Sequence, residues 1–166
     1  MSIHSLFYAT NRNHLGQDRW HPKAYGVKFS DDGVENLRFG KLSITADESE
    51  IRRRLIEDGG AIGIGNGTEL ANDLSKRVRF AKITAYREML RSDISDKLQK
   101  DAKLGSRGLF ADLREEMLKH SDVLIYIHGY NVSWEDAAGS ALALQLMLNR
   151  SDSADPKQRV LVVLFT

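Results

Sequence analysis

The sequence predicts an α/β fold in which antiparallel strands near the N-terminus are followed by a parallel strand–helix–strand unit. Residues 122–128 and 159–165 form two mostly apolar runs, and the segment between them is rich in alanine and leucine. Continuous apolar runs of this length are typical of parallel strands that are covered on both faces. We therefore expect the two runs to be buried strands of one sheet, joined by a crossing helix.

The crossing helix is expected to begin at Ser133. The segment Ser133-Trp-Glu-Asp136 has the pattern of a capping box, with acidic residues in the first turn, where they suit the helix dipole. Ligands of α/β proteins bind just beyond the carboxyl ends of the strands. The four residues His128-Gly129-Tyr130-Asn131 occupy that position and form the candidate site.

Composition limits the class of protein. The chain of 166 residues fits one domain, 1–166, and its content of 42% apolar and 28% charged residues is ordinary for a globular protein. A net charge of +1 makes no general case for a nucleic-acid partner. Cysteine is absent, which excludes disulfides, thiolate nucleophiles and cysteine metal sites. The histidines do not fall at metal-ligand spacing, so neither a metal nor another cofactor is expected.

The N-terminal residues show no targeting signal. A basic start followed by a long apolar run, which marks a signal peptide, is not present. No apolar run approaches the ~20 residues that a membrane-spanning helix needs. A cytoplasmic protein without a membrane span is the expectation.

The N-terminal quarter is predicted to be antiparallel. Three segments have strand-like patterns: 5–10, 25–29 and 36–45. Asp32-Gly33 between the second and third segments predicts a hairpin. The alternation of the third segment slips near Gly40, which predicts a bulge. Residues 13–24 are expected to form a loop.

Residues 47–120 are predicted to be a mainly helical segment. Residues 47–57 carry acids first and bases after, with apolar residues at helical spacing. A second stripe at intervals of three and four predicts that most of 81–119 is helical; its members are Ile83, Tyr86, Leu90, Ile94 and Leu98. The glycines at 63, 65 and 67 lack the lysine and the spacing of a phosphate-binding loop, so a turn is favoured there.

The roles of three residues, Arg12 after the first strand and His128 and Asn131 in the loop, leave alternatives open. Arg12 follows the first strand, where it either binds an anion or pairs with an acid such as Asp18. His128 and Asn131 are binding candidates, and the alternative is an ordinary turn that Asn131 holds through local hydrogen bonds.

The apolar run at 159–166 raises a question of coverage. A central parallel strand bonds neighbours on both sides, and an uncovered apolar strand favours aggregation. We expect that another chain, or a C-terminal part beyond Thr166, completes the sheet.

The segment from Val123 to Ala137, with His-Gly-Tyr-Asn and Ser-Trp-Glu-Asp, resembles the α/β-hydrolase superfamily. It is more closely similar to a poorly characterised bacterial group of esterase/lipase-like hydrolases. Three further segments resemble strands of that group: 7–12, 37–44 and 160–166. Residues 47–120 match no part of it, so they look like a helical insertion into an α/β-hydrolase-like sheet.

The resemblance implies hydrolysis of an ester, thioester or amide bond in a small ester or lipid-like substrate, by a serine nucleophile, a histidine base and an acid. In such folds the loop after the corresponding strand supplies an amide of the oxyanion hole. By this match the backbone N–H of Tyr130 is the candidate donor, and Gly129 allows close approach.

The match is incomplete, because no Gly-x-Ser-x-Gly elbow occurs in the sequence. In the superfamily the nucleophile, the acid and the base would all follow residue 166. The resemblance therefore implies a truncated, incomplete hydrolase sheet that is inactive by itself. The alternative is a non-catalytic, hydrolase-like module that binds a partner or completes the sheet of another chain.

Overall fold

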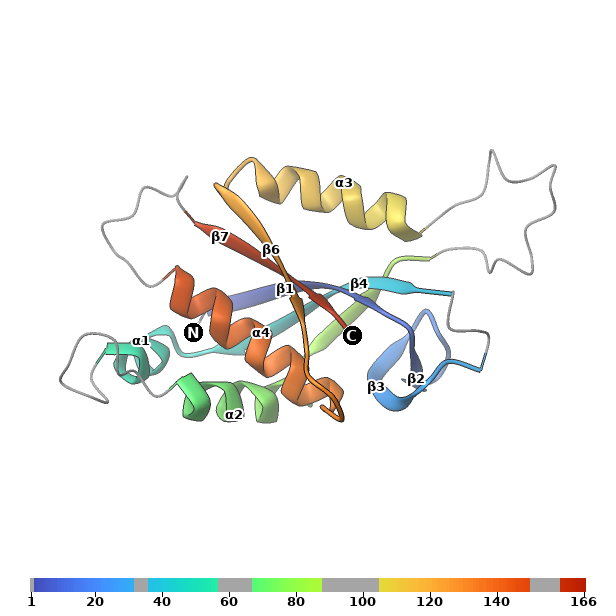
Figure 1. Cartoon of the computed structure of the whole chain (residues 1–166), viewed down its shortest axis with the longest axis horizontal. Helices are drawn as coiled ribbons and strands as arrows, with labels where there is room; N and C mark the ends of the chain where they lie inside the picture. Colours follow the sequence, from blue (N-terminus) through green and yellow to red (C-terminus); the bar gives the residue numbers. More distant parts are fainter. Residues whose placement is uncertain (1, 32–35, 57–66, 88–104, 150–158) are drawn as a thin grey trace.

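The computed structural model describes residues 2–31, 36–56, 67–87, 105–149 and 159–166. These segments form an α/β structure with a mixed five-stranded sheet, a separate two-stranded sheet and four helices (Figure 1). The strand order of the larger sheet is β5-β4-β1-β7-β6, and the smaller sheet pairs β2 with β3. The strands are β1 Ser2–Thr10, β2 Arg12–Gly16, β3 Pro22–Phe29, β4 Arg38–Ala46, β5 Lys82–Ala85, β6 Asp122–Ile127 and β7 Val160–Phe165. The helices are α1 Glu48–Ile56, α2 Gly67–Val78, α3 Gly105–Met117 and α4 Trp134–Leu148.

The predicted parallel unit is present. β6 and β7 pair in parallel, with Ile125 opposite Val163, and α4 connects them along the chain. β7 also pairs in parallel with β1, whereas β1 is antiparallel to β4. The expected change from antiparallel to parallel pairing therefore occurs at β1, the middle strand of the sheet.

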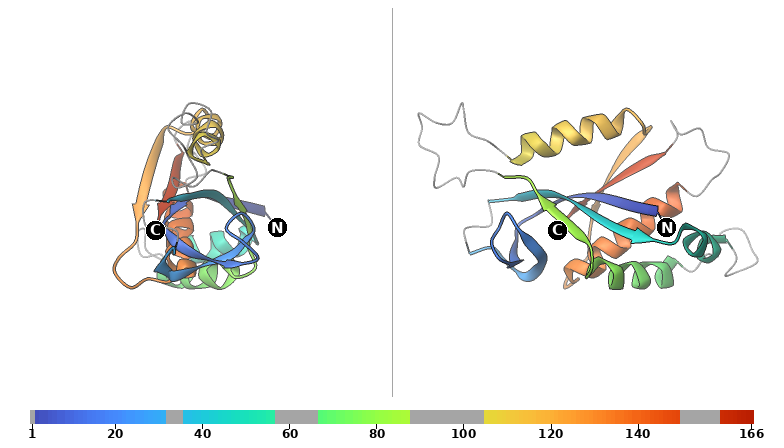
Figure 2. Two further views of the ribbon diagram at one scale, coloured as in Figure 1. Left: turned by 90° about the vertical axis from the view of Figure 1, so that its right-hand side faces the viewer. Right: turned by 180° about the vertical axis from the view of Figure 1, so that it is seen from behind.

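Helices cover the two faces of the sheet unequally. α1, α2 and α4 lie on one face, and α3 lies on the other (Figures 1 and 2). The larger core joins α1, α2 and α4 to the sheet through residues such as Leu6, Leu42, Leu74 and Leu142. The smaller core beneath α3 consists of Phe7, Leu109, Leu113, Leu161 and Val163. Alternation along each strand explains this division, because successive side chains point to opposite faces.

α2 and α4 approach each other closely at Gly139. A Cβ atom at this position would lie 2.6 Å from the backbone nitrogen of Ser75 and 2.7 Å from the carbonyl oxygen of Ala71. Real Cβ atoms essentially never come so near to other heavy atoms. The alanine-rich composition of α4 thus serves contact with a helix as well as with the sheet.

The predicted hairpin between residues 25–29 and 36–45 is wrong. β3 pairs with β2 in the smaller sheet, whereas β4 pairs with β1 and β5. The turn at Asp32-Gly33 lies outside the described residues. The pairing followed β1 instead of the local turn signal, because β1 offers β4 an antiparallel partner over nine residues and places Leu6 in the larger core and Phe7 in the smaller one.

The predicted bulge at Gly40 is also wrong. Gly40 lies opposite Tyr8 in a continuous register. Phe39 packs in the smaller core, while Leu42 packs in the larger one. The slip in the sequence pattern therefore reflects a strand with an apolar residue on each face, and no extra residue is inserted.

Two further assignments change in the structure. Residues 13–24, expected to be a loop, contribute to β2 and β3. The stripe assigned to a helix at 81–119 begins with β5, whose residue Ile83 pairs with Leu42 of β4. Tyr86 follows β5 and packs against the smaller core, whereas the last three residues of the stripe lie in 88–104, outside the described residues; α3 begins at Gly105. The segment 47–120 thus supplies an edge strand as well as helices.

β5 and β6 are the edge strands of the larger sheet in the described part of the chain, so the expectation that 159–165 would lack a neighbour is wrong. β7 lies between β1 and β6, and its residues Leu161 to Leu164 are buried. In β6, by contrast, Ile125 is 65% exposed and Ile127 is 70% exposed. The prediction that 122–128 is covered on both faces is therefore wrong as well.

Candidate functional site

The segment 128–131 forms an open turn between β6 and α4. An added Cβ at Gly129 would meet no heavy atom within 4 Å, and the side chain of Tyr130 is fully exposed. Asn131 has a φ of 56°, a left-handed conformation that asparagine tolerates better than most residues. The backbone at Gly129 and Tyr130 is therefore accessible to a ligand at the carboxyl end of a parallel strand.

The predicted cap at Ser133 anchors the far end of this turn. The hydroxyl oxygen of Ser133 accepts a hydrogen bond from the backbone N–H of Asp136 at 3.1 Å. The same hydroxyl donates to Oδ2 of Asp136 at 2.7 Å. Trp134, the first residue of α4, is buried in the larger core. The turn is thus attached directly to a helix that packs on the sheet.

Arg12 connects the turn to strands from the N-terminal part of the chain through hydrogen bonds. It is only 7% exposed, and Nη2 donates to the carbonyl oxygen of Val132 at 2.7 Å and to Nε2 of His128 at 3.0 Å. Its other terminal nitrogen, Nη1, donates to the carbonyl oxygen of Gly26 at 3.3 Å. One side chain at the start of β2 therefore connects β3 with both ends of the turn.

The environment of Arg12 bears on the two roles that the sequence left open. Asp18 forms its side-chain contact with His21, where Nδ1 lies 2.9 Å from a carboxylate oxygen. Burial lowers the pKa of the Arg12 guanidinium from its ordinary value, and the negative charge of Glu135 partly opposes this. The Arg12 guanidinium is thus engaged by His128 and by the carbonyl oxygens of Gly26 and Val132.

Backbone hydrogen bonds connect the carboxyl ends of β1 and β7. The backbone N–H of Thr166 donates to the carbonyl oxygen of Ala9 at 3.0 Å, and that of Asn11 donates to the carbonyl oxygen of Thr166 at 3.2 Å. The hydroxyl of Thr10 accepts from the backbone N–H of Arg12 at 3.1 Å. The carboxyl ends of β1 and β7 are thereby joined next to the segment that positions Arg12.

Three aromatic rings pack together in the larger core at the start of α4. Tyr8, Tyr25 and Trp134 pack edge to face, with centroids 4.8–5.4 Å apart. The phenol oxygens of the two tyrosines lie 2.9 Å apart. Burial raises the pKa of both phenols, that of Tyr25 to about 12. Both phenols are therefore neutral near pH 7 and act as hydrogen-bonding groups of the core.

An apolar surface adjoins the turn on the α3 side of the sheet. Val123 packs against the core beneath α3, and alternation places Ile125 and Ile127 on the same face. Phe165 of β7 shares this face with Val163 and is 37% exposed. Exposed apolar side chains therefore lie on β6, whose carboxyl end leads into the candidate site, and on the neighbouring strand β7.

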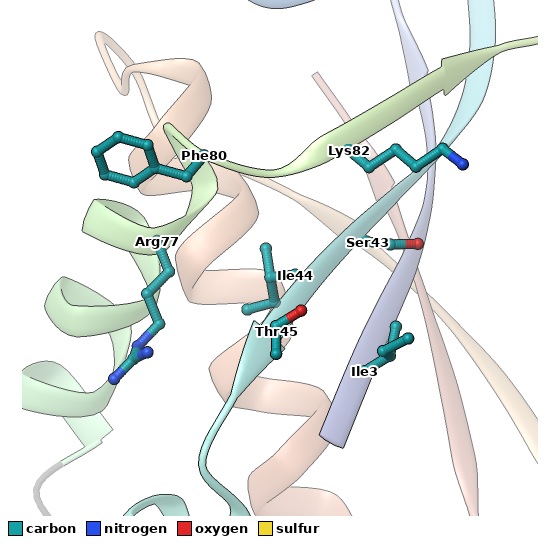
Figure 3. Close-up of a pocket in the computed structure, with 7 residues that line it drawn as sticks. All are labelled: Ile3, Ser43, Ile44, Thr45, Arg77, Phe80 and Lys82. Carbon is teal, nitrogen blue, oxygen red and sulfur yellow. The ribbon is translucent and has the colours of Figure 1, made fainter. Parts of the chain in front are cut away.

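A hollow with a volume of about 400 Å³ lies elsewhere, between β4, the end of α2 and the start of β5. Its lining includes exposed Ile3 and Phe80 together with Arg77 and Lys82. The side chains of Arg77, Phe80 and Lys82 point in different directions and do not converge (Figure 3). Arg77 also contacts Glu50 at 3.3 Å. This hollow offers no set of groups aimed at one ligand.

The structure brings together most of the residues that the sequence singled out. Arg12 contacts His128 across 116 positions of sequence, and no sequence pattern linked the two residues. The carbonyl groups of Gly26 and Val132 that hold Arg12 were not predictable, because backbone acceptors leave no sequence signal. The positive φ of Asn131 could have been anticipated from its residue type and its place in a tight turn.

Neither a candidate metal site nor a candidate membrane-spanning helix occurs in the described residues. No group of three or more His, Cys, Asp or Glu side chains in them is arranged to hold a metal ion. None of the helices in those segments combines the length and the apolar character needed to cross a bilayer. A scan of family models and searches of curated proteins and of solved structures found no match to the chain.

Proposed function

We propose that this chain supplies the oxyanion-binding loop of a serine hydrolase of the esterase or lipase-like type, whose catalytic triad lies outside residues 1–166. The observation that carries the proposal is the open Gly129-Tyr130 turn at the carboxyl end of a parallel strand, clamped by Arg12. An oxyanion hole requires backbone N–H groups that are fixed in place and free of protein acceptors. Pre-organisation of this kind is typically worth ~3 kcal/mol of activation free energy per donor.

The surroundings of the turn suit an ester or lipid-like substrate. Ile125, Ile127 and Phe165 expose apolar surface beside it, and an acyl chain would bury part of that surface. Backbone hydrogen bonds also join the carboxyl ends of β1 and β7, which restrains the strands next to the site. The same apolar side chains and the unpaired edge of β6 suit an additional strand, supplied by another chain or by a C-terminal part.

The alternative function is that of a non-catalytic module that pairs with another chain. The exposed edge of β6 favours this alternative, since a long apolar edge strand is a template for strand addition. Multi-angle light scattering of the purified chain tests it. Self-association or precipitation that is relieved by Ile125→Lys would support pairing through β6, and a stable soluble monomer would count against it.

Two assays test the hydrolase proposal. The purified chain is first incubated with p-nitrophenyl esters and a fluorophosphonate probe. We expect neither turnover nor labelling, because none of its serines lies in an elbow motif. The same assays are then applied to the assembly that joins this chain to an elbow-bearing segment, whether encoded beyond Thr166 or in a separate polypeptide.

Substitutions at Tyr130 provide a matched pair for the assembly. Tyr130→Pro removes the proposed N–H donor, and we expect kcat to fall by roughly 10²-fold. Tyr130→Ala keeps the N–H and removes only an exposed ring, so kcat is expected to stay near the wild-type value. Ester turnover by residues 1–166 alone, or full kcat in Tyr130→Pro, would refute the proposal.

A further inference from the structure

We propose that Arg12 acts through His128 to aim the backbone N–H of Tyr130, so that both residues are positioning residues of the candidate site. The relay has three steps: Arg12 and the carbonyl of Gly129 hold the imidazole in one tautomer, the bonded carbonyl fixes the direction of the next N–H, and Arg12 also holds the other end of the turn. The mechanical part of the inference stands on the contacts alone, whereas its catalytic part rests on the proposed function.

The first step determines the tautomer of His128. An arginine side chain has only donors, so Nε2 of His128 accepts the hydrogen bond from Nη2 at 3.0 Å. The ring proton of the neutral imidazole is therefore on Nδ1. Nδ1 lies 2.5 Å from the carbonyl oxygen of Gly129, which can only accept. Both contacts thus require the same tautomer, and His128 has no free lone pair for use as a general base.

The second step concerns the peptide between Gly129 and Tyr130. The described residues contain no cis peptide bond, so the C=O of Gly129 and the N–H of Tyr130 point in opposite directions within one plane. When Nδ1 of His128 binds that oxygen, the N–H is turned away from the imidazole. A donor on the carbonyl also polarises the peptide, which strengthens its N–H as a donor.

The third step is the clamp at the other end of the turn. Nη2 of Arg12 also binds the carbonyl oxygen of Val132, and Nη1 binds that of Gly26. This geometry needs a flat group with several donors, which lysine does not provide. The negative charge of Glu135 raises the Arg12 pKa and so opposes the effect of burial.

The tautomer is measured directly on the purified chain. A long-range proton–nitrogen NMR correlation spectrum distinguishes imidazole rings protonated on Nδ1 from those protonated on Nε2. We expect His128 to be protonated on Nδ1. Protonation on Nε2 in the wild-type chain would overturn the inference, whatever the enzymatic activity proves to be.

Two substitutions of the partly exposed His128 separate the steps of the relay. The amide nitrogen of asparagine overlies Nδ1 of histidine, so His128→Asn keeps the donor to Gly129 and loses the link to Arg12. The amide of glutamine reaches the position of Nε2, so His128→Gln keeps an acceptor for Arg12 and loses the donor. We expect the Tyr130 amide resonance to shift in both variants and to shift further in His128→Gln, which loses the donor to Gly129. Unchanged Tyr130 resonances in both variants would overturn the relay.

Arg12 is tested with Arg12→Lys and Arg12→Ala, the latter with and without added guanidinium ion. We expect His128 to lose its preference for protonation on Nδ1 in both variants, and added guanidinium to restore that preference in Arg12→Ala. Protonation on Nδ1 that persists in both variants would overturn the role of Arg12. In an active assembly kcat is expected to fall by about 10²-fold with KM unchanged. Loss of the tautomer without any change in kcat would refute the catalytic part of the inference, whereas the proposed oxyanion role is tested separately by Tyr130→Pro.

Discussion

Tyr8 and Gly40 face each other across β1 and β4, and the phenol of Tyr8 occupies the space that a side chain at position 40 would need. A Cβ atom there would collide with the phenol oxygen and with the carbonyl oxygen of Thr84. The phenol oxygen of Tyr8 lies 2.9 Å from that of Tyr25. The ring of Tyr25 packs edge to face against Trp134, the first residue of α4. Glycine at position 40 thus makes room for the packed rings of Tyr8, Tyr25 and Trp134.

Gly40→Ala is therefore expected to destabilise the fold by about 1–3 kcal/mol, the usual range for overpacking. The free energy of unfolding is measured by urea denaturation. Tyr8→Phe in the same background removes the phenol oxygen but leaves the ring carbon Cζ and the carbonyl oxygen of Thr84 in place, so the double variant should recover part of the loss. Equal losses in Gly40→Ala and in the double variant would contradict the role given to the phenol.

The different environments of β6 and β7 predict different responses to side-chain truncation. Val162 is 0% exposed, whereas Ile127 is 70% exposed. We expect Val162→Ala to lower the free energy of unfolding by about 2 kcal/mol and Ile127→Ala to change it by less than about 1 kcal/mol. Chemical denaturation of both variants checks this, and a larger effect at Ile127 would show that β6 is covered.

Removal of the helix cap is expected to act on both stability and the turn. Ser133→Ala loses the hydroxyl that accepts from the N–H of Asp136, at a typical cost of ~1 kcal/mol. Ser133→Thr keeps a capping hydroxyl and should be close to wild type. Hydrogen exchange at Asp136 reports the loss locally, and protection that is equal in the alanine and threonine variants would contradict the capping role.

The buried phenols predict a loss of stability in alkaline solution. The pKa of Tyr25 is raised from 10.0 to about 12 in the folded protein, so the folded state binds its proton more tightly than the unfolded state does. The associated stability is complete below pH 10 and is lost as the pH rises towards 12. Tyr25→Phe should show a shallower decline in this window, as measured by denaturation at several pH values. A decline of unchanged slope would contradict the assignment.

Some elements were predictable because their signals are local. Ser133 caps α4 as its capping box indicated, and the apolar run before His128 ends in a turn as expected. The short strand β5 was not predictable in the same way, because Ile83 and Tyr86 fit a helical stripe until β4 offers Ile83 a backbone partner. Likewise, the Asp-Gly signal between β3 and β4 could not reveal that each strand pairs elsewhere.

By itself, the sequence determined the α/β class, the parallel unit around α4 and the turn at residues 128–131, because periodicity and capping depend on residues close together in the chain. Only the tertiary structure decided that β7 is enclosed while β6 forms an edge, and that Arg12 reaches His128. Strand order and a guanidinium held by backbone carbonyls depend on which distant segments meet in space, and neither leaves a pattern along the chain.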